Sequence, residues 1–78
     1  MTDTRIIPDP NKPHDPTEVR VLPSMVPVWA LVGYWKAVGF KLAKVCEDYG
    51  ISAEELNAAL AYYARHPTDI DVRLMQNG

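Results

Sequence analysis

Few side chains in this sequence could do covalent or metal chemistry, and their spacing does not group them into a site. His14 lies in a proline-rich stretch and His66 falls at the end of an expected helix, and neither has a metal-ligand spacing to Cys46. The four glycines are scattered, so the sequence has no pattern for a phosphate-binding loop. We therefore expect a protein that is not an enzyme, with no catalytic residues, no metal ion and no cofactor.

Carboxylates stand in two adjacent pairs, Glu47-Asp48 and Glu54-Glu55, on either side of Gly50. Such a cluster could serve in acid–base chemistry or hold a divalent cation. A simpler interpretation is that Glu54 and Glu55 complement the positive N-terminus of a helix, while the other pair belongs to a solvated helix face. We prefer this simpler interpretation.

The basic side chains point to a possible contact with nucleic acid. Lys36, Lys41 and Lys44 form the one basic cluster in a chain of 78 residues whose formal net charge is −2. This charge argues against strong non-specific binding, which needs many phosphate contacts, but it allows a local patch. For three lysines alone, an ordinary solvated helix face is the slightly preferred interpretation.

The segment 45–57 predicts a turn between two helices. Gly50 can adopt the left-handed conformation that ends a helix, and Ser52 can cap the next helix. Glu55 lies three residues after Ser52, which makes a capping box, and Ile51 should be buried at the corner. Two helices joined by three residues, with glycine first, are typical of a helix-turn-helix.

Apolar residues recur at helical spacing on both sides of this turn. Stripes at positions i, i+3, i+4 and i+7 run through residues 28–35, 42–49 and 56–63. The sequence therefore predicts a mainly α fold. We expect a small helix-turn-helix domain, homeodomain-like or winged-helix-like, with about four helices and short N-terminal strands.

Prolines and a cap set the limits of these helices. Pro27 suits the first position of the first helix, and Gly39 should end it. Pro67 should stop the third helix at about residue 66. Thr68, followed by Asp71, is a weaker capping signal for a short last helix.

The N-terminal part has a different character. Six of the seven prolines precede Val28, which excludes a helix there. We expect residues 1–18 to be a flexible proline-rich segment, although 4–7 could form a short strand, and residues 19–78 to be the folded domain. Residues 19–22 read as another strand, whose partner could come from a second copy of the chain.

In a helix-turn-helix, the second helix enters the major groove and the helix before it crosses the backbone. Lys41 and Lys44 would then contact phosphates. Asn57 could pair with adenine and Arg65 could touch a phosphate, whereas Glu54 would repel the backbone unless it accepted a hydrogen bond from cytosine. These residues are the predicted DNA contacts.

The third helix also has a surface rich in alanine, and we expect Ala53, Ala58 and Ala61 to be exposed. Small residues let two helices approach closely, so this composition favours packing against another helix. Trp29 and Tyr62 fall off the main apolar stripes. Large exposed aromatic side chains anchor protein interfaces, and we expect these two to contact a partner.

Size and composition bear on the assembly and the location. A chain this short buries a modest share of its surface, so a lone monomer would be marginally stable and a homodimer is expected. Its single cysteine excludes an internal disulfide. Residues 1–5 contain no apolar signal run and no later segment could span a bilayer, so we expect a cytoplasmic protein with no membrane contact.

Four stretches carry a family resemblance: Pro-Val-Trp-Ala-Leu-Val at 27–32, Glu-Asp-Tyr-Gly-Ile-Ser-Ala-Glu-Glu at 47–55, Ala-Ala-Leu-Ala-Tyr-Tyr at 58–63 and His-Pro-Thr-Asp-Ile-Asp at 66–71. In order and spacing they resemble the family called domain of unknown function 433, over roughly residues 19–77. The sequence departs from the family at 23–26, where Pro-Ser-Met-Val replaces a Gly-Thr-Arg-Ile-type segment and removes its arginine.

The resemblance implies a winged or homeodomain-like fold, often dimeric, and a function as a VapB-type antitoxin. Such proteins are commonly encoded beside a PIN-like nuclease toxin, which they bind, and they repress their own promoter. The toxin surface would then be the N-terminal segment, the helix faces or the last helix with Ile70, Leu74 and Met75. The alternative hypothesis is a protein-interaction module that does not touch DNA.

Overall fold

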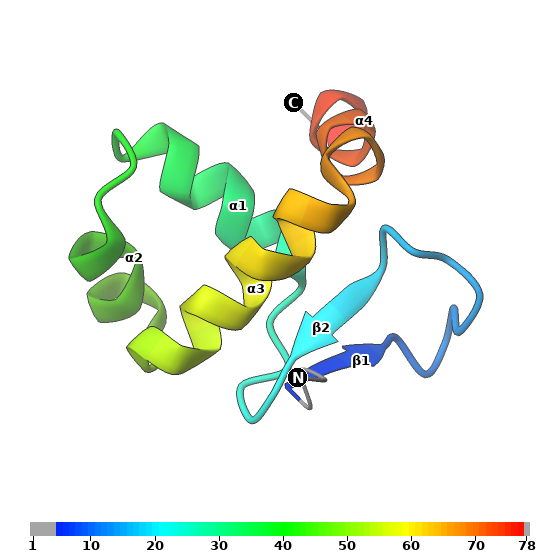
Figure 1. Cartoon of the computed structure of the whole chain (residues 1–78), viewed down its shortest axis with the longest axis horizontal. Helices are drawn as coiled ribbons and strands as arrows, with labels where there is room; N and C mark the ends of the chain where they lie inside the picture. Colours follow the sequence, from blue (N-terminus) through cyan, green and yellow to red (C-terminus); the bar gives the residue numbers. More distant parts are fainter. Residues whose placement is uncertain (1–4, 78) are drawn as a thin grey trace.

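Four helices pack beside a short two-stranded antiparallel sheet in the computed structural model, which describes residues 5–77 (Figure 1). The elements are β1 (Ile6–Pro8), β2 (Val19–Val21), α1 (Val28–Ala37), α2 (Leu42–Tyr49), α3 (Ala53–Arg65) and α4 (Pro67–Asn77). In Figure 1, α1 and α3 occupy the middle, with α2 at one end and the strands at the other. This arrangement confirms the predicted mainly helical class with short N-terminal strands.

The predicted corner between α2 and α3 is present. Gly50 adopts the left-handed conformation, with φ 66° and ψ 36°, and the backbone N–H of Ile51 bonds the carbonyl of Cys46 at 3.1 Å. This bond spans the glycine and satisfies a carbonyl at the end of α2. Ser52 accepts a hydrogen bond from the backbone N–H of Glu55 at 3.1 Å, and Ile51 is buried. Gly50, Ile51 and Ser52 therefore join the two helices as a helix-turn-helix requires.

The other half of the expected capping box does not form. The Glu55 carboxylate turns away from Ser52 and accepts hydrogen bonds from the backbone N–H of Ser24, at 3.0 Å, and from the Ser24 hydroxyl. Glu55 is only 2% exposed, so its charge is held among these donors. A residue expected to cap its own helix instead fastens the β2–α1 connection to α3.

The buried side of α3 is rotated from the predicted stripe. Leu56 and Ala59 are buried as expected, but Leu60 is only partly buried. Ala58, expected to be exposed, is 6% exposed, and Tyr62 is 8% exposed. The strands contact α3, and the Tyr62 hydroxyl reaches the carbonyl of Pro16 between them, so the N-terminal part covers this side of the helix.

The sheet forms within one chain. Ile7 of β1 lies opposite Arg20 of β2 in an antiparallel register, so the strand at 19–21 does not need a second copy. The expected boundary at residue 18 falls between two strands of the same sheet. The expected strand at 4–7 includes Thr4, which lies outside the described residues. The observed β1 begins at Ile6.

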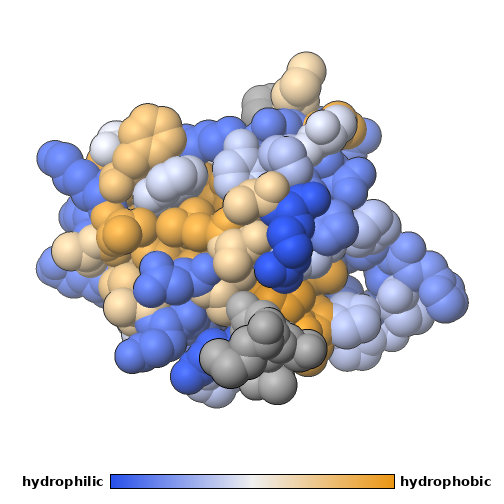
Figure 2. Space-filling model, in the orientation of Figure 1, coloured by the Kyte–Doolittle hydropathy of each residue, from blue (hydrophilic) through white to orange (hydrophobic). Residues whose placement is uncertain are grey.

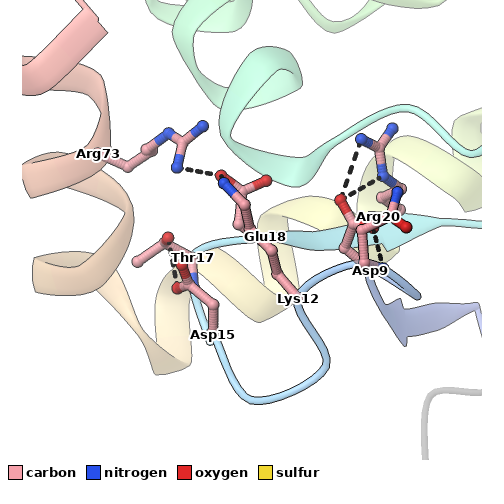
Figure 3. Close-up of polar contacts among 8 residues, drawn as sticks. Asp9, Lys12, Asp15, Thr17, Glu18, Arg20 and Arg73 are labelled. Atoms are coloured by element: carbon pink, nitrogen blue, oxygen red, sulfur yellow. Dashed lines mark hydrogen bonds and ion pairs between the residues drawn. The ribbon is translucent and has the colours of Figure 1, made fainter.

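Polar contacts hold the connection between the strands against the helices (Figure 3). Arg20 pairs with Asp9 at 3.3 Å, and Glu18, which is buried, forms an ion pair with Arg73 of α4. The backbone N–H of Asn11 and, to a smaller extent, Arg20 lower the pKa of the Asp9 carboxyl. The N-terminal part is thereby tied to the last helix of the chain.

The fourth helix is longer than the short one expected and begins one residue before the predicted Thr68 cap. Pro67 occupies its first position, which suits a residue without an N–H, and His66 alone separates α4 from α3. Ile70 is fully buried. An added Cβ at Gly33 of α1 would lie 2.9 Å from Leu74, so glycine allows α4 to approach α1 closely.

Candidate binding surfaces

The carboxylates that flank the helix-turn-helix corner do not converge. Glu55 is buried against Ser24, Asp48 accepts a hydrogen bond from Tyr34, and Glu47 and Glu54 are exposed. Within residues 5–77, no group of three histidine, cysteine, aspartate or glutamate side chains could hold a metal ion. The four carboxylates around the corner therefore do not form a single site.

The three lysines expected to form one basic cluster are dispersed. Lys44 pairs with Asp48 at 3.2 Å, on the side of α2 that meets Tyr34 of α1. Lys36 pairs with Asp71 of α4 at 2.9 Å. Lys41 is exposed just before α2, and the described part of the chain gives it no ion pair.

The predicted DNA-reading residues of α3 are accessible but carry little net positive charge. Asn57 and Arg65 are exposed, and the Arg65 guanidinium lies 6.0 Å from the centre of the Tyr62 ring. Glu54 is exposed near the start of the same helix. One acidic and one basic side chain on this face attract phosphate far less than a basic patch would.

An apolar groove lies along the outer side of α1. Its volume is about 470 Å³, and Ala30, Gly33 and Ala37 are the small residues of α1 that line it. Larger side chains lining it come from three helices: Trp29 and Tyr34 of α1, Tyr49 of α2 and Leu74 of α4. The Tyr34 and Tyr49 rings meet edge to face with centroids 5.4 Å apart. This packing places a rigid aromatic pair in the wall of the groove.

Polar contacts steady the elements that build this groove. The Tyr34 hydroxyl and the Lys44 ammonium lower the pKa of the Asp48 carboxyl. The hydrogen bond from Tyr34 ties α1 to α2, and the Lys44–Asp48 ion pair lies within α2. Lys36 and the Tyr63 hydroxyl lower the pKa of the Asp71 carboxyl, which ties α4 to α1 and α3. Each of these pairs joins opposite charges, so neither adds net charge beside the groove.

The predicted partner residues divide into two groups. Trp29 and Leu74 line the groove, and Met75 is 80% exposed. Tyr62 and Ile70 lie in the core, which corrects the expectation that they face a partner. The Tyr62 hydroxyl donates to the carbonyl of Pro16 at 2.6 Å because the N-terminal part folds back over α3.

A second apolar surface was missed by the sequence argument. In α2, Leu42 and Tyr49 remain 46% and 36% exposed although both belong to the predicted apolar stripe. Phe40, between α1 and α2, is 60% exposed and contacts Trp35, with ring centroids 4.8 Å apart. Figure 2 shows an apolar band over α2 and α3 on this face. The spacing did not indicate this exposure, because Leu42 and Tyr49 share the apolar stripe of the fully buried Val45.

Comparisons with protein families, with curated proteins and with solved structures find no match for this chain. The resemblance to domain of unknown function 433 therefore stays a prediction. Among residues 5–77, no helix combines the length and the apolar composition that crossing a bilayer requires.

Proposed function

We propose that this chain is an antitoxin-type regulator that acts by binding another protein in the groove along α1. The observation that carries the proposal is the groove itself, lined by Trp29, Tyr34, Tyr49 and Leu74. The family resemblance supplies the candidate partner, a PIN-like nuclease toxin. Binding would neutralise the toxin by occupying its surface, without any catalytic step by this chain.

The lining of the groove suits a protein partner. Aromatic side chains bury a large apolar area at little cost in conformational entropy, which is why they recur at the centres of interfaces. The small lining residues Ala30, Gly33 and Ala37 leave room for a protruding side chain or a helix. Because the neighbouring ion pairs are neutral overall, the groove would select a largely apolar segment of the partner rather than a strongly charged one.

The test is co-expression of the tagged chain with a PIN-like nuclease toxin from the same genome. The wild-type chain should co-purify with the nuclease and suppress its cleavage of RNA. Ala37→Trp should fill the groove and abolish both effects, whereas Ala43→Trp, at an exposed alanine that does not line the groove, should preserve them. Wild-type chain that neither binds nor inhibits the nuclease, or an Ala37→Trp variant as active as wild type, would refute the proposal.

Operator DNA is the second candidate ligand, and the helix-turn-helix corner favours it. Lys41, Asn57 and Arg65 are all exposed, and they lie just before α2 or on α3 as a DNA-reading arrangement needs. A gel-shift titration against the DNA upstream of its own gene tests this activity. Retarded DNA that is lost in Lys41→Ala and in Asn57→Ala would support it, and no retardation at low salt would exclude it.

A further inference from the structure

The exposed face of α3 has no covering element within the described chain. Ala53, Asn57, Ala61 and Ala64 are exposed along the helix, and Leu60 beside them is only partly buried. Phe40 and Leu42 are exposed as well, and Figure 2 shows an apolar band over α2 and α3. We name these residues of α3, from Ala53 to Ala64, the α3 face. A helix face of mostly small, uncharged side chains with no covering element suits close packing against another helix.

We propose that the α3 face is the interface between two copies of this chain, packed antiparallel about a two-fold axis that lies level with Ala59 along the helix. The argument is charge complementarity between the two ends of the helix. Glu54 and Arg65 are both exposed, at opposite ends of α3. Eleven residues separate them, which places them about 16 Å apart along the helix and about 20° apart around it. They therefore lie on one edge of the α3 face and cannot reach each other within one chain.

Two-fold symmetry brings these two charges together. An axis that passes between the two helices, perpendicular to them and level with Ala59, keeps each edge on its own side and reverses the helix direction, so Glu54 meets the partner's Arg65 at both ends. The same axis sets Ala53 opposite the partner's Ala64 and Asn57 opposite the partner's Ala61. Small residues at these positions let the helices approach closely. Parallel packing would separate the opposite charges and align the helix dipoles unfavourably.

This dimer and DNA reading compete for the same residues. In the antiparallel pair Asn57 lies inside the contact, where it cannot reach a base edge. The groove along α1 is lined by α1, α2 and α4 and includes no residue of α3, so it stays available to a protein partner. The inference therefore goes beyond the proposed function, and either can fail without the other.

A charge swap tests the proposal, with the dimer dissociation constant measured by sedimentation equilibrium at low salt. Glu54→Arg and Arg65→Glu each replace two attractions by two repulsions and should each raise the dissociation constant about tenfold. The double variant restores opposite charges and should return it to near the wild-type value. Glu47→Arg, at an exposed acidic residue of α2, is the matched control and should leave it unchanged.

Loss of folding cannot imitate this pattern. Both single substitutions oppose the helix dipole, and the double variant opposes it twice, yet only the double should recover the dimer. Circular dichroism of each variant gives the fraction folded. A monomeric wild-type chain, a dimer insensitive to the single substitutions, or a double variant as weak as the singles would overturn the proposal.

Discussion

The groove along α1 and the face of α3 are both apolar and uncovered, but they differ in shape. The groove combines small residues with aromatic and aliphatic side chains from three helices, steadied by hydrogen bonds and ion pairs. The α3 face belongs to one helix, and its exposed residues are alanines and Asn57, with Glu54 and Arg65 along one edge. A hollow suits a protruding segment of a different protein, whereas a flat helix with opposite charges at its ends suits a copy of itself. The two surfaces therefore fit different partners.

Different contacts hold the two surfaces in place, so different substitutions should disrupt them. The groove exists only while α4 packs on α1, because Leu74 lies in its lining. The α3 face depends on how α3 is held from behind, by the sheet and by Glu55. Substitutions that loosen α4 should therefore affect the groove, and substitutions that loosen the contacts behind α3 should affect the α3 face.

The largest loss of stability is expected when the packing of α4 on α1 is weakened. Ile70 is fully buried, and Ile70→Ala should lower the free energy of unfolding by about 2–5 kcal/mol, from lost burial and the cavity left behind. Met75→Ala, further along the same helix but at an exposed residue, should change it by less than about 0.5 kcal/mol. Urea denaturation of both variants measures the difference. Equal effects would mean that α4 does not pack as described.

A smaller loss of stability is expected for a substitution at Glu55, on the buried side of α3. Glu55→Gln removes the charge that accepts two hydrogen bonds from Ser24 and should lower the free energy of unfolding by about 1.5–3 kcal/mol. Glu54→Gln, at the exposed neighbour, should cost about 0.3–1 kcal/mol through the helix dipole. Thermal and urea unfolding at low protein concentration give both values. A larger loss of unfolding free energy for Glu54→Gln than for Glu55→Gln would contradict the hydrogen bonds between Glu55 and Ser24.

The smallest effect is expected in the dependence of folding stability on acid pH. The pKa values of Asp48 and Asp71 are lowered in the folded chain, first by the hydrogen bonds from Tyr34 and Lys36 respectively. A lowered folded-state pKa stabilises the fold fully above the unfolded-state value of about 3.9, and that stabilisation is lost as the pH falls through the folded-state value. Stability should therefore fall in acid, and Asp48→Asn/Asp71→Asn should fall less steeply than wild type between about pH 5 and pH 2. A double variant with an unchanged slope would contradict this assignment.

Local signals predicted the corner of the helix-turn-helix well. Gly50, Ile51 and Ser52 act through backbone conformation and bonds that span only a few residues, so the sequence contains all the necessary information. The same holds for the fully buried residues Val28 and Leu31, which lie on one side of a single helix. Periodicity detects such residues because they share one helix face.

The side on which α3 is buried could not be predicted in this way. Its cover comes from the strands and from the carbonyl of Pro16, which Tyr62 reaches across 46 residues of sequence. Glu55, Ala58, Ala59 and Tyr62 do follow helical spacing, but the pattern requires a buried carboxylate, which is rare without a specific partner. That partner, Ser24, is supplied by the chain fold and not by any local motif.

The antiparallel contact between two α3 helices is tested most directly by mixing two cysteine variants. In a Cys46→Ser background, Ala53→Cys chains are mixed with Ala64→Cys chains under mild oxidation. An antiparallel dimer sets these positions opposite each other, so the mixture should form a disulfide-linked heterodimer while neither variant alone should cross-link, because a disulfide needs Cα atoms within about 7 Å. Cross-linking of either variant with itself, or none in the mixture, would contradict the account.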